Sequence, residues 1–178
     1  MDRRRDALLG AAAMLLAIAE VAREMGPPAV ATVGTISVEP AQVNVVPGVA
    51  RFTVDARHSD NAQRALLVAE ITKVCKVAGR ERDLSADVRV LRERGAVQLH
   101  ERATDVARRA CVACGVTPRE MTSGAGHDAQ VLSAAASAAM LFVPSVGGRS
   151  HCPEEATAAE DVILGTRALA AALRELAY

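Results

Sequence analysis

Apolar positions recur with a helical period in two long stretches of the first half of the chain. Residues 7–25 are rich in alanine and leucine; Asp6 precedes them as an N-cap, and Gly26 followed by two prolines ends the pattern. Across 61–78, apolar side chains return every three or four positions. The spacing therefore predicts two amphipathic helices.

Three neighbouring stretches have the pattern of strands. Residues 30–38 and 50–56 alternate and are rich in β-branched side chains, and 84–91 reads as a third long strand. Residues 43–48 are interpreted as a turn preceded by a strand fragment. The order helix, strand, strand, helix, strand predicts a two-layer α+β sandwich.

After Gly95 the character of the sequence changes. The predicted elements are a helix over 98–114 ended by Gly115, a short strand over 121–126, a helix over 127–136, a strand over 139–144 and a last helix over 155–177. The fully apolar 139–144 is typical of a buried parallel sheet. The fold class is therefore α/β: a two-layer α+β domain over 1–94, a hinge at 92–95, and part of an α/β domain over 95–178.

Composition narrows the function classes. The 178 residues carry 21 basic and 21 acidic side chains, and only 2% are aromatic. This balance favours neither nucleic acid nor an anionic membrane as a partner. The apolar run 7–19 resembles a signal peptide, but acidic residues flank it and it is too short to span a bilayer. The four unevenly spaced cysteines indicate reduced thiols, so a cytoplasmic location is expected.

Two loops of small residues, 123–130 and 142–155, each contain one histidine beside carboxylates. Glycine lets a backbone approach a ligand closely, and histidine serves as metal ligand, acid, base or donor. Structural alternatives stay open. His127 is also consistent with a buried histidine next to a helix-capping Asp128, and His151 with a loop histidine bonded to backbone. Glu154 and Glu155 either support the site or begin a helix.

Six segments in order carry a family likeness: RRDAL (4–8), ATVG (31–34), VNVVPG (43–48), FTVDAR (52–57), SGAGHDA (123–129) and FVPSVGGRSHCPEE (142–155). The chain resembles the metal-dependent amidohydrolases related to aminoacylase and carboxypeptidase. It looks closest to the N-carbamoyl-L-amino-acid hydrolases, allantoate amidohydrolases and β-ureidopropionases.

The resemblance implies a domain organisation and a substrate class. Residues 1–94 correspond to a lid and dimerisation domain, through which a homodimer is expected, and 95–178 to the C-terminal part of the catalytic domain. The family places most of its metal ligands and its catalytic glutamate before the lid. The chain is therefore expected to be a C-terminal portion of a hydrolase of C–N bonds in N-carbamoyl amino acids, allantoate or related linear amides.

The resemblance also implies roles for four residues. His151 matches the last ligand of a site for two divalent ions, Zn or Mn, and His127 a catalytic and substrate-binding residue. Asn44 and Arg57 match residues that bind the carboxylate of a carbamoyl or ureido substrate, for which arginine offers a rigid fork. In the family, metal-activated water attacks the amide or ureido carbon.

Because most ligands and the base are missing, the isolated chain is predicted to be inactive. The alternative function is a dimerisation or binding module, or a truncated gene product with no function of its own.

Overall fold

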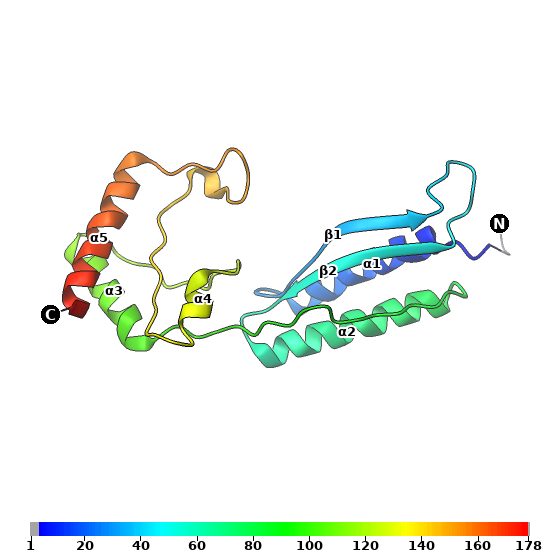
Figure 1. Cartoon of the computed structure of the whole chain (residues 1–178), viewed down its shortest axis with the longest axis horizontal. Helices are drawn as coiled ribbons and strands as arrows, with labels where there is room; N and C mark the ends of the chain where they lie inside the picture. The colour runs from blue at the N-terminus through cyan, green and yellow to red at the C-terminus, as the bar shows by residue number, and fades with distance from the viewer. Residues whose placement is uncertain (1–3, 178) are drawn as a thin grey trace. The chain divides into compact units, whose positions relative to one another are not determined.

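The computed structural model describes residues 4–177, which divide into two compact units, the first ending at Ala96 and the second beginning at Val97. Within these residues the fold is a mixture of five α-helices and one two-stranded antiparallel sheet. The first unit contains α1 (Ala7–Met25), β1 (Val30–Glu39), β2 (Val49–Arg57) and α2 (Asn61–Arg80) (Figure 1). The second contains α3 (Glu101–Ala113), α4 (Asp128–Leu132), the 3-10 turn η1 (Val146–Gly148) and α5 (Ala159–Ala177).

Helix α1 confirms the predicted helix and its start signal. The carboxylate of Asp6 accepts hydrogen bonds from the backbone N–H groups of Leu8 and Leu9, so it satisfies two of the donors that a helix start leaves open. Gly26 ends the helix with a φ of 72°, a conformation that costs glycine little. Its own N–H closes the last turn by donating to Ala22 and Arg23.

The two predicted strands of the first unit are confirmed and form one hairpin. β1 and β2 pair antiparallel from Val30 opposite Arg57 to Glu39 opposite Val49. The register shifts once, between Val33 and Thr35, which identifies a β-bulge at Gly34. The loop between the strands is a turn, and the strand fragment predicted before it is absent from the described residues.

Helices α1 and α2 cover one face of this hairpin and form the core of the first unit. Leu67 is 0% exposed and Ile18 is 1% exposed. Alternate strand residues pack against this cluster: Ala31, Val33, Phe52, Val54 and Ala56. The other face is polar, as the period of two requires when a sheet buries only one side.

The third strand predicted over 84–91 is wrong: no backbone ladder joins this segment to β1 or β2 in the described residues. Its start is bonded to α2, where the Leu84 N–H donates to the Gly79 carbonyl at 2.9 Å. Ala86 packs on the core, but Val90 and Leu91 are exposed. The alternation of apolar and polar residues indicates which side chains face a core. It does not show that another strand lies close enough to pair with the backbone.

The predicted hinge is anchored to the first unit. Asn61, the first residue of α2, bonds the backbone of Ala96 in both directions, with its Nδ2 donating at 3.1 Å and its Oδ1 accepting at 2.8 Å. Arg64 pairs with Glu93 at 2.8 Å. The boundary after Ala96 lies two residues beyond the one expected from the sequence.

In the second unit the predicted helices form, but the predicted strands do not. The segments 121–126 and 139–144 carry no ladder in the described part of the chain. Helix α4 is shorter than the predicted 127–136, and α5 begins at Ala159 rather than near 155. The core of this unit is a small contact of α3 with α5 through Val106, Ala110 and Ala172.

Among residues 4–177, no helix combines the length and hydropathy that a membrane span requires.

Candidate functional site

The four residues predicted to form a site lie in two different units. Asn44 and Arg57 belong to the hairpin of the first unit, and His127 and His151 to loops of the second. The side chains of all four are exposed. Each unit therefore holds two of the predicted site residues.

Arg57 ends β2 and is held by a carboxylate two residues earlier on the same face of the strand. Its Nε donates to Oδ1 of Asp55 at 2.8 Å, and its Nη2 donates to Oδ2 of the same carboxylate. This hydrogen-bonded pairing lowers the pKa of Asp55 and raises the pKa of Arg57. Asp55 thus fixes the direction of the guanidinium, a role that the sequence interpretation missed although residues 55 and 57 alternate onto one face.

Asn44 lies in the turn that joins β1 to β2, at the opposite end of the hairpin from Arg57. At about 3.3 Å per residue, β2 alone spans roughly 26 Å. The structure therefore does not bring Asn44 and Arg57 together within one chain, although both are predicted to bind a substrate carboxylate.

His127 is itself the N-cap of α4. Its Nδ1 accepts a hydrogen bond from the Ala129 N–H at 3.3 Å, and the imidazole is exposed. The alternative of a buried histidine beside a capping Asp128 is therefore wrong, since Asp128 is the first helical residue. With Nδ1 acting as acceptor, the proton of the neutral ring is assigned to Nε2, which can donate outward.

His151 occupies a left-handed backbone conformation with a φ of 58°, which is uncommon for a residue other than glycine. Its backbone N–H donates to Oε2 of Glu155 at 2.7 Å. Glu155 precedes α5, so it supports this loop and is not in the first turn of that helix. The loop is closed by a hydrogen bond from the Val146 N–H to the Ala156 carbonyl at 2.8 Å.

The described residues contain no complete set of metal ligands. Nowhere in residues 4–177 do three or more His, Cys, Asp or Glu side chains come close enough to hold one ion. A structural zinc ion takes about four protein ligands, and a catalytic one about three. The residues present therefore do not fit a resident metal centre, and His151 alone offers a single nitrogen ligand.

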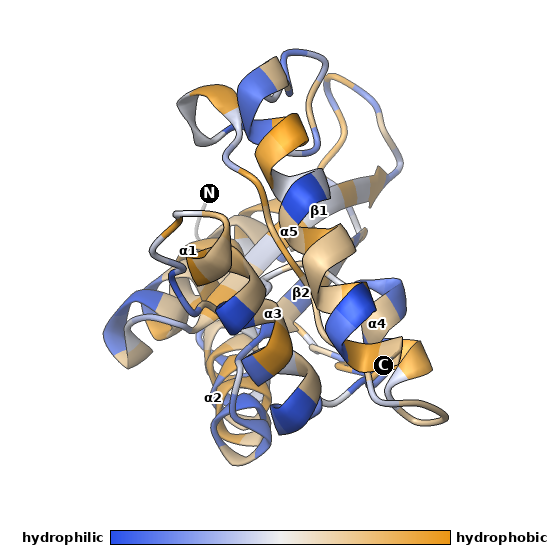
Figure 2. Cartoon of the chain, turned by 90° about the vertical axis from the view of Figure 1, so that its left-hand side faces the viewer, coloured by the Kyte–Doolittle hydropathy of each residue, from blue (hydrophilic) through white to orange (hydrophobic). Residues whose placement is uncertain are grey.

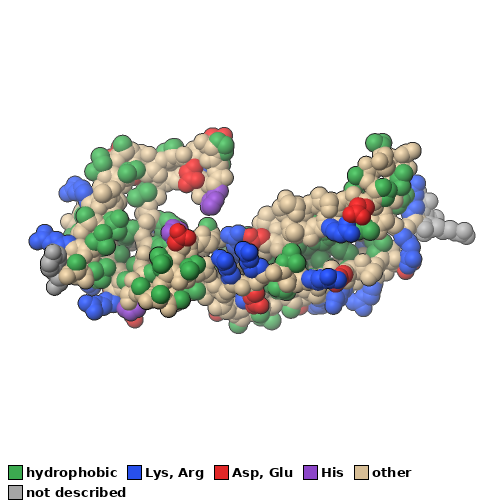
Figure 3. All heavy atoms as spheres, viewed as in Figure 1, with side chains coloured by type: hydrophobic (Ala, Val, Ile, Leu, Met, Phe, Trp, Pro, Cys, Tyr) green, Lys and Arg blue, Asp and Glu red, His purple; other side chains and the backbone are tan. Residues whose placement is uncertain are grey.

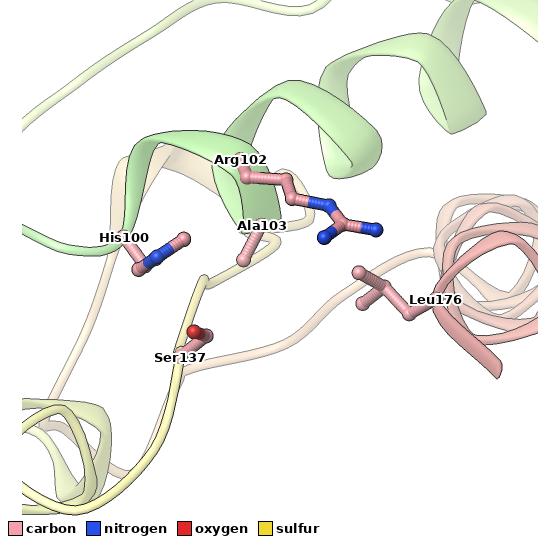
Figure 4. A pocket seen from close by; sticks show the side chains of 5 residues that line it. All are labelled: His100, Arg102, Ala103, Ser137 and Leu176. Atoms are coloured by element: carbon pink, nitrogen blue, oxygen red, sulfur yellow. The ribbon is translucent and has the colours of Figure 1, made fainter.

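One open pocket of about 270 Å³ lies in the second unit, and no predicted site residue lines it. Its lining combines the start of α3, the segment before 139 and the end of α5: His100, Arg102, Ala103, Ser137 and Leu176 (Figure 4). His100 is the N-cap of α3 but makes no side-chain capping bond. No sequence motif marked these residues, because they are distant in the chain and of ordinary types.

Comparison with known proteins gives a consistent family. The family described as Peptidase family M20/M25/M40 matches residues 6–175. The chain is 35% identical over 176 residues to N-carbamoyl-L-amino-acid amidohydrolase of Paenarthrobacter aurescens, covering 99% of this chain and 43% of that protein. It is 33% identical over 178 residues to allantoate amidohydrolase of Escherichia coli strain K12, covering 100% and 43%.

A solved structure supports the same relation. An amidase of the hydantoinase/carbamoylase family from Burkholderia vietnamiensis superposes with a TM-score of 0.90 at 32% identity, covering 96% of this chain and 41% of that one. The chain thus spans less than half the length of the relatives that it matches.

Proposed function

Because this chain belongs to peptidase family M20/M25/M40, we propose that it is the C-terminal portion of a metal-dependent hydrolase of C–N bonds. The proposed substrates are N-carbamoyl amino acids, allantoate or a related linear amide. The observation that carries the proposal is that relatives named for those two activities match almost the whole chain while it spans 43% of each. As an isolated chain it is proposed to be inactive.

The two units take different parts in this proposal. The first, with its hairpin covered by two helices, is assigned as the lid and the homodimer contact. The second is assigned as part of the catalytic domain, and its two histidine loops form one wall of the active site. The absence of a three-ligand cluster among the described residues agrees with a wall rather than a whole site. A cytoplasmic location remains part of the proposal.

The proposed substrate-binding residues are Arg57, Asn44 and His127, which are all exposed. Arg57 is assigned to bind the substrate carboxylate, and its guanidinium is oriented by Asp55, which accepts hydrogen bonds from its Nε and Nη2. Asn44 lies at the other end of the hairpin, so it serves either another group of the substrate or a substrate bound to a second copy. His127 donates from Nε2 to the carbonyl oxygen under attack, because its Nδ1 is occupied by the Ala129 N–H.

His151 is assigned as one metal ligand among several that this chain does not contain. Family members are metal-dependent, and imidazole nitrogen suits Zn and Mn. The bond from its backbone to Glu155 fixes the loop, so the ring is presented from a defined position.

The proposal is tested with a chimera in which this chain replaces the matching part of the Escherichia coli allantoate amidohydrolase. The chimera, supplied with Zn or Mn, is assayed against allantoate and N-carbamoyl amino acids. Hydrolysis is expected for the chimera and not for the isolated chain. Loss of metal content and activity is expected for His151→Ala.

The matched control is His58→Ala in the first unit, where the histidine Nδ1 accepts a hydrogen bond from the Asp60 N–H. It is expected to retain metal and activity. A folded, metal-loaded chimera that hydrolyses none of these substrates contradicts the proposed chemistry, and hydrolysis by the isolated chain contradicts the proposed incompleteness.

A further inference from the structure

The pocket of about 270 Å³ in the second unit is lined by three polar side chains from two separate parts of the chain. His100 and Arg102 lie at the start of α3, and Ser137 lies in the segment that follows α4. The backbone N–H of His100 donates to the Ala138 carbonyl at 3.1 Å, which holds this segment beside the start of α3. The fold therefore brings these side chains to one cavity.

Every polar side chain that lines this pocket can donate a hydrogen bond, and none is a carboxylate. In the described part of the chain, neither Arg102 nor Ser137 has a side-chain partner. Glu101 precedes Arg102 but does not line the pocket. Glu175, near the end of α5, is held by Arg109, whose Nε donates to Oε1 at 3.0 Å. The charge of Arg102 therefore favours an anion in this pocket.

Ala103 adds a buried donor to the lining. The residue is only 3% exposed, and its N–H lies in the first turn of α3, where no carbonyl of the helix can accept from it. The N-cap His100 makes no side-chain bond to it, and no other acceptor among residues 4–177 does so. Buried N–H groups in native proteins are nearly always paired, so this donor requires an acceptor from outside the chain.

The remaining part of the lining is apolar. Leu176 is 46% exposed at the end of α5, and the methyl group of Ala103 lies between the side chains of His100 and Arg102 (Figure 4). Figure 2 shows hydrophilic and hydrophobic residues together along α3 and α5, and Figure 3 shows Lys and Arg side chains near the end of α5, close to hydrophobic ones. The pocket therefore offers donors and an apolar contact to one ligand.

We propose that this pocket binds a small organic anion with a carboxylate and a short aliphatic chain. The carboxylate accepts hydrogen bonds from Arg102, Ser137 and the N–H of Ala103, and the chain contacts Leu176. A volume of about 270 Å³ suits a small ligand, since pockets for drug-sized molecules are roughly 300–1,000 Å³. The inference does not depend on the proposed function, because no residue assigned to hydrolysis lines the pocket.

The test is titration of the full chain, followed by amide nuclear magnetic resonance, with butanoate, acetate, butanamide and inorganic phosphate at constant ionic strength. Butanoate is expected to shift the amides of Arg102, Ala103 and Ser137 saturably. Its Kd is expected to be about threefold or more below that of acetate, because two further methylene groups leave water. Butanamide, which lacks the charge, and phosphate, which lacks the chain, are expected to bind more weakly than butanoate.

The lining is tested by two variants at exposed positions. Arg102→Gln is expected to weaken butanoate binding about tenfold while the helix content, measured by circular dichroism, stays unchanged. Leu176→Ala is expected to remove the preference for butanoate over acetate without weakening acetate. The matched control is Arg167→Gln, an exposed arginine of α5 that does not line the pocket and is expected to leave binding unchanged.

Four outcomes overturn the proposal. The amides do not shift saturably with butanoate, so that water alone occupies the pocket. Arg102→Gln and Arg167→Gln weaken binding equally, so that the attraction is a general effect of charge. Butanamide binds as tightly as butanoate, so that the carboxylate is not recognised. Phosphate binds more tightly than butanoate, so that the apolar contact with Leu176 plays no part.

Discussion

The two units of this chain have similar helix content but different cores. In the first, large aliphatic side chains such as Ile18, Leu67 and Ile71 are buried between two helices and a hairpin. In the second, Val106 is the largest side chain buried among the described residues, and the others are alanines. The difference indicates that the first unit encloses a core of large aliphatic side chains, whereas the second unit buries small side chains and leaves its large apolar side chains, other than Val106, wholly or partly exposed.

The largest effect is expected from a cavity in the first unit. Leu67→Ala removes a fully buried side chain and should lower the free energy of unfolding of this unit by about 2–5 kcal/mol. The neighbouring Leu66→Ala, where the side chain is 53% exposed, is the control and should cost less than about 1 kcal/mol. The urea dependence of amide exchange in α2 measures the loss of stability in both variants. Equal losses would contradict the burial of Leu67 in the core.

A smaller effect is expected from the same kind of change in the second unit. Val106→Ala removes two methyl groups from the contact with Ala110 and Ala172, which should lower stability by about 1–2 kcal/mol. The loss should appear in the exchange of α3 and α5 and not in α1 or α2, because the units have separate cores. A loss shared by all four helices would show that the units unfold together.

Removal of the α1 cap is expected to cost about 1 kcal/mol. Asp6→Ala leaves the N–H groups of Leu8 and Leu9 without their acceptor, whereas Asp6→Asn retains one and serves as the control. Denaturant unfolding followed by amide exchange in the first unit gives the two values. If alanine and asparagine behave alike, the side chain does not carry this capping interaction.

An element could be predicted from the sequence when the residues that it packs against lie in the same unit. The sequence predicted the helix after Asp6 and the two hairpin strands because caps, turns and alternating side chains are local signals. The side chains that these signals place on one face are buried in the core of the same unit. The apolar run 139–144 was predicted as a strand, and its side chains do contact α5. No strand pairs with this segment in the described residues. The prediction failed because hydrophobicity indicates that side chains are buried but does not determine whether a second strand lies beside them.

In the candidate site too, the sequence indicated local features but not the neighbours of each residue. The sequence placed His127 and His151 in loops, but it did not show that His127 caps α4 or that Glu155 binds the backbone of His151. It also did not reveal that Asn44 and Arg57 lie at opposite ends of one hairpin, since only the strand register establishes this. Bonds between residues a few positions apart depend on backbone angles that residue types do not fix.

The smallest effect is expected from the ion pair on the outer face of the hairpin. Arg57 depresses the folded-state pKa of Asp55 below its ordinary 3.8, so the stabilisation is present above that value and is lost as the pH falls through the folded pKa. Both side chains are about half exposed, so Asp55→Asn should cost no more than about 0.5 kcal/mol at pH 7 and nothing below the folded pKa.

The control for this pair is Asp87→Asn, which removes an ion pair of the same spacing with Arg89 on a fully exposed site and should leave stability unchanged. Urea unfolding at pH 7 and at pH 2, in low and high salt, measures both variants. A cost for Asp55→Asn that persists undiminished at pH 2 would contradict the electrostatic origin.

Amide hydrogen exchange of the isolated chain, resolved by segment, tests most directly whether the second unit is an incomplete part of a larger fold. We expect slow exchange in α1, β1, β2 and α2, intermediate exchange in α3 and α5, and exchange in 139–144 near the rate of an unstructured peptide. Protection of 139–144 equal to that of β2 would show that the isolated chain already provides a partner for this backbone, and would contradict the account.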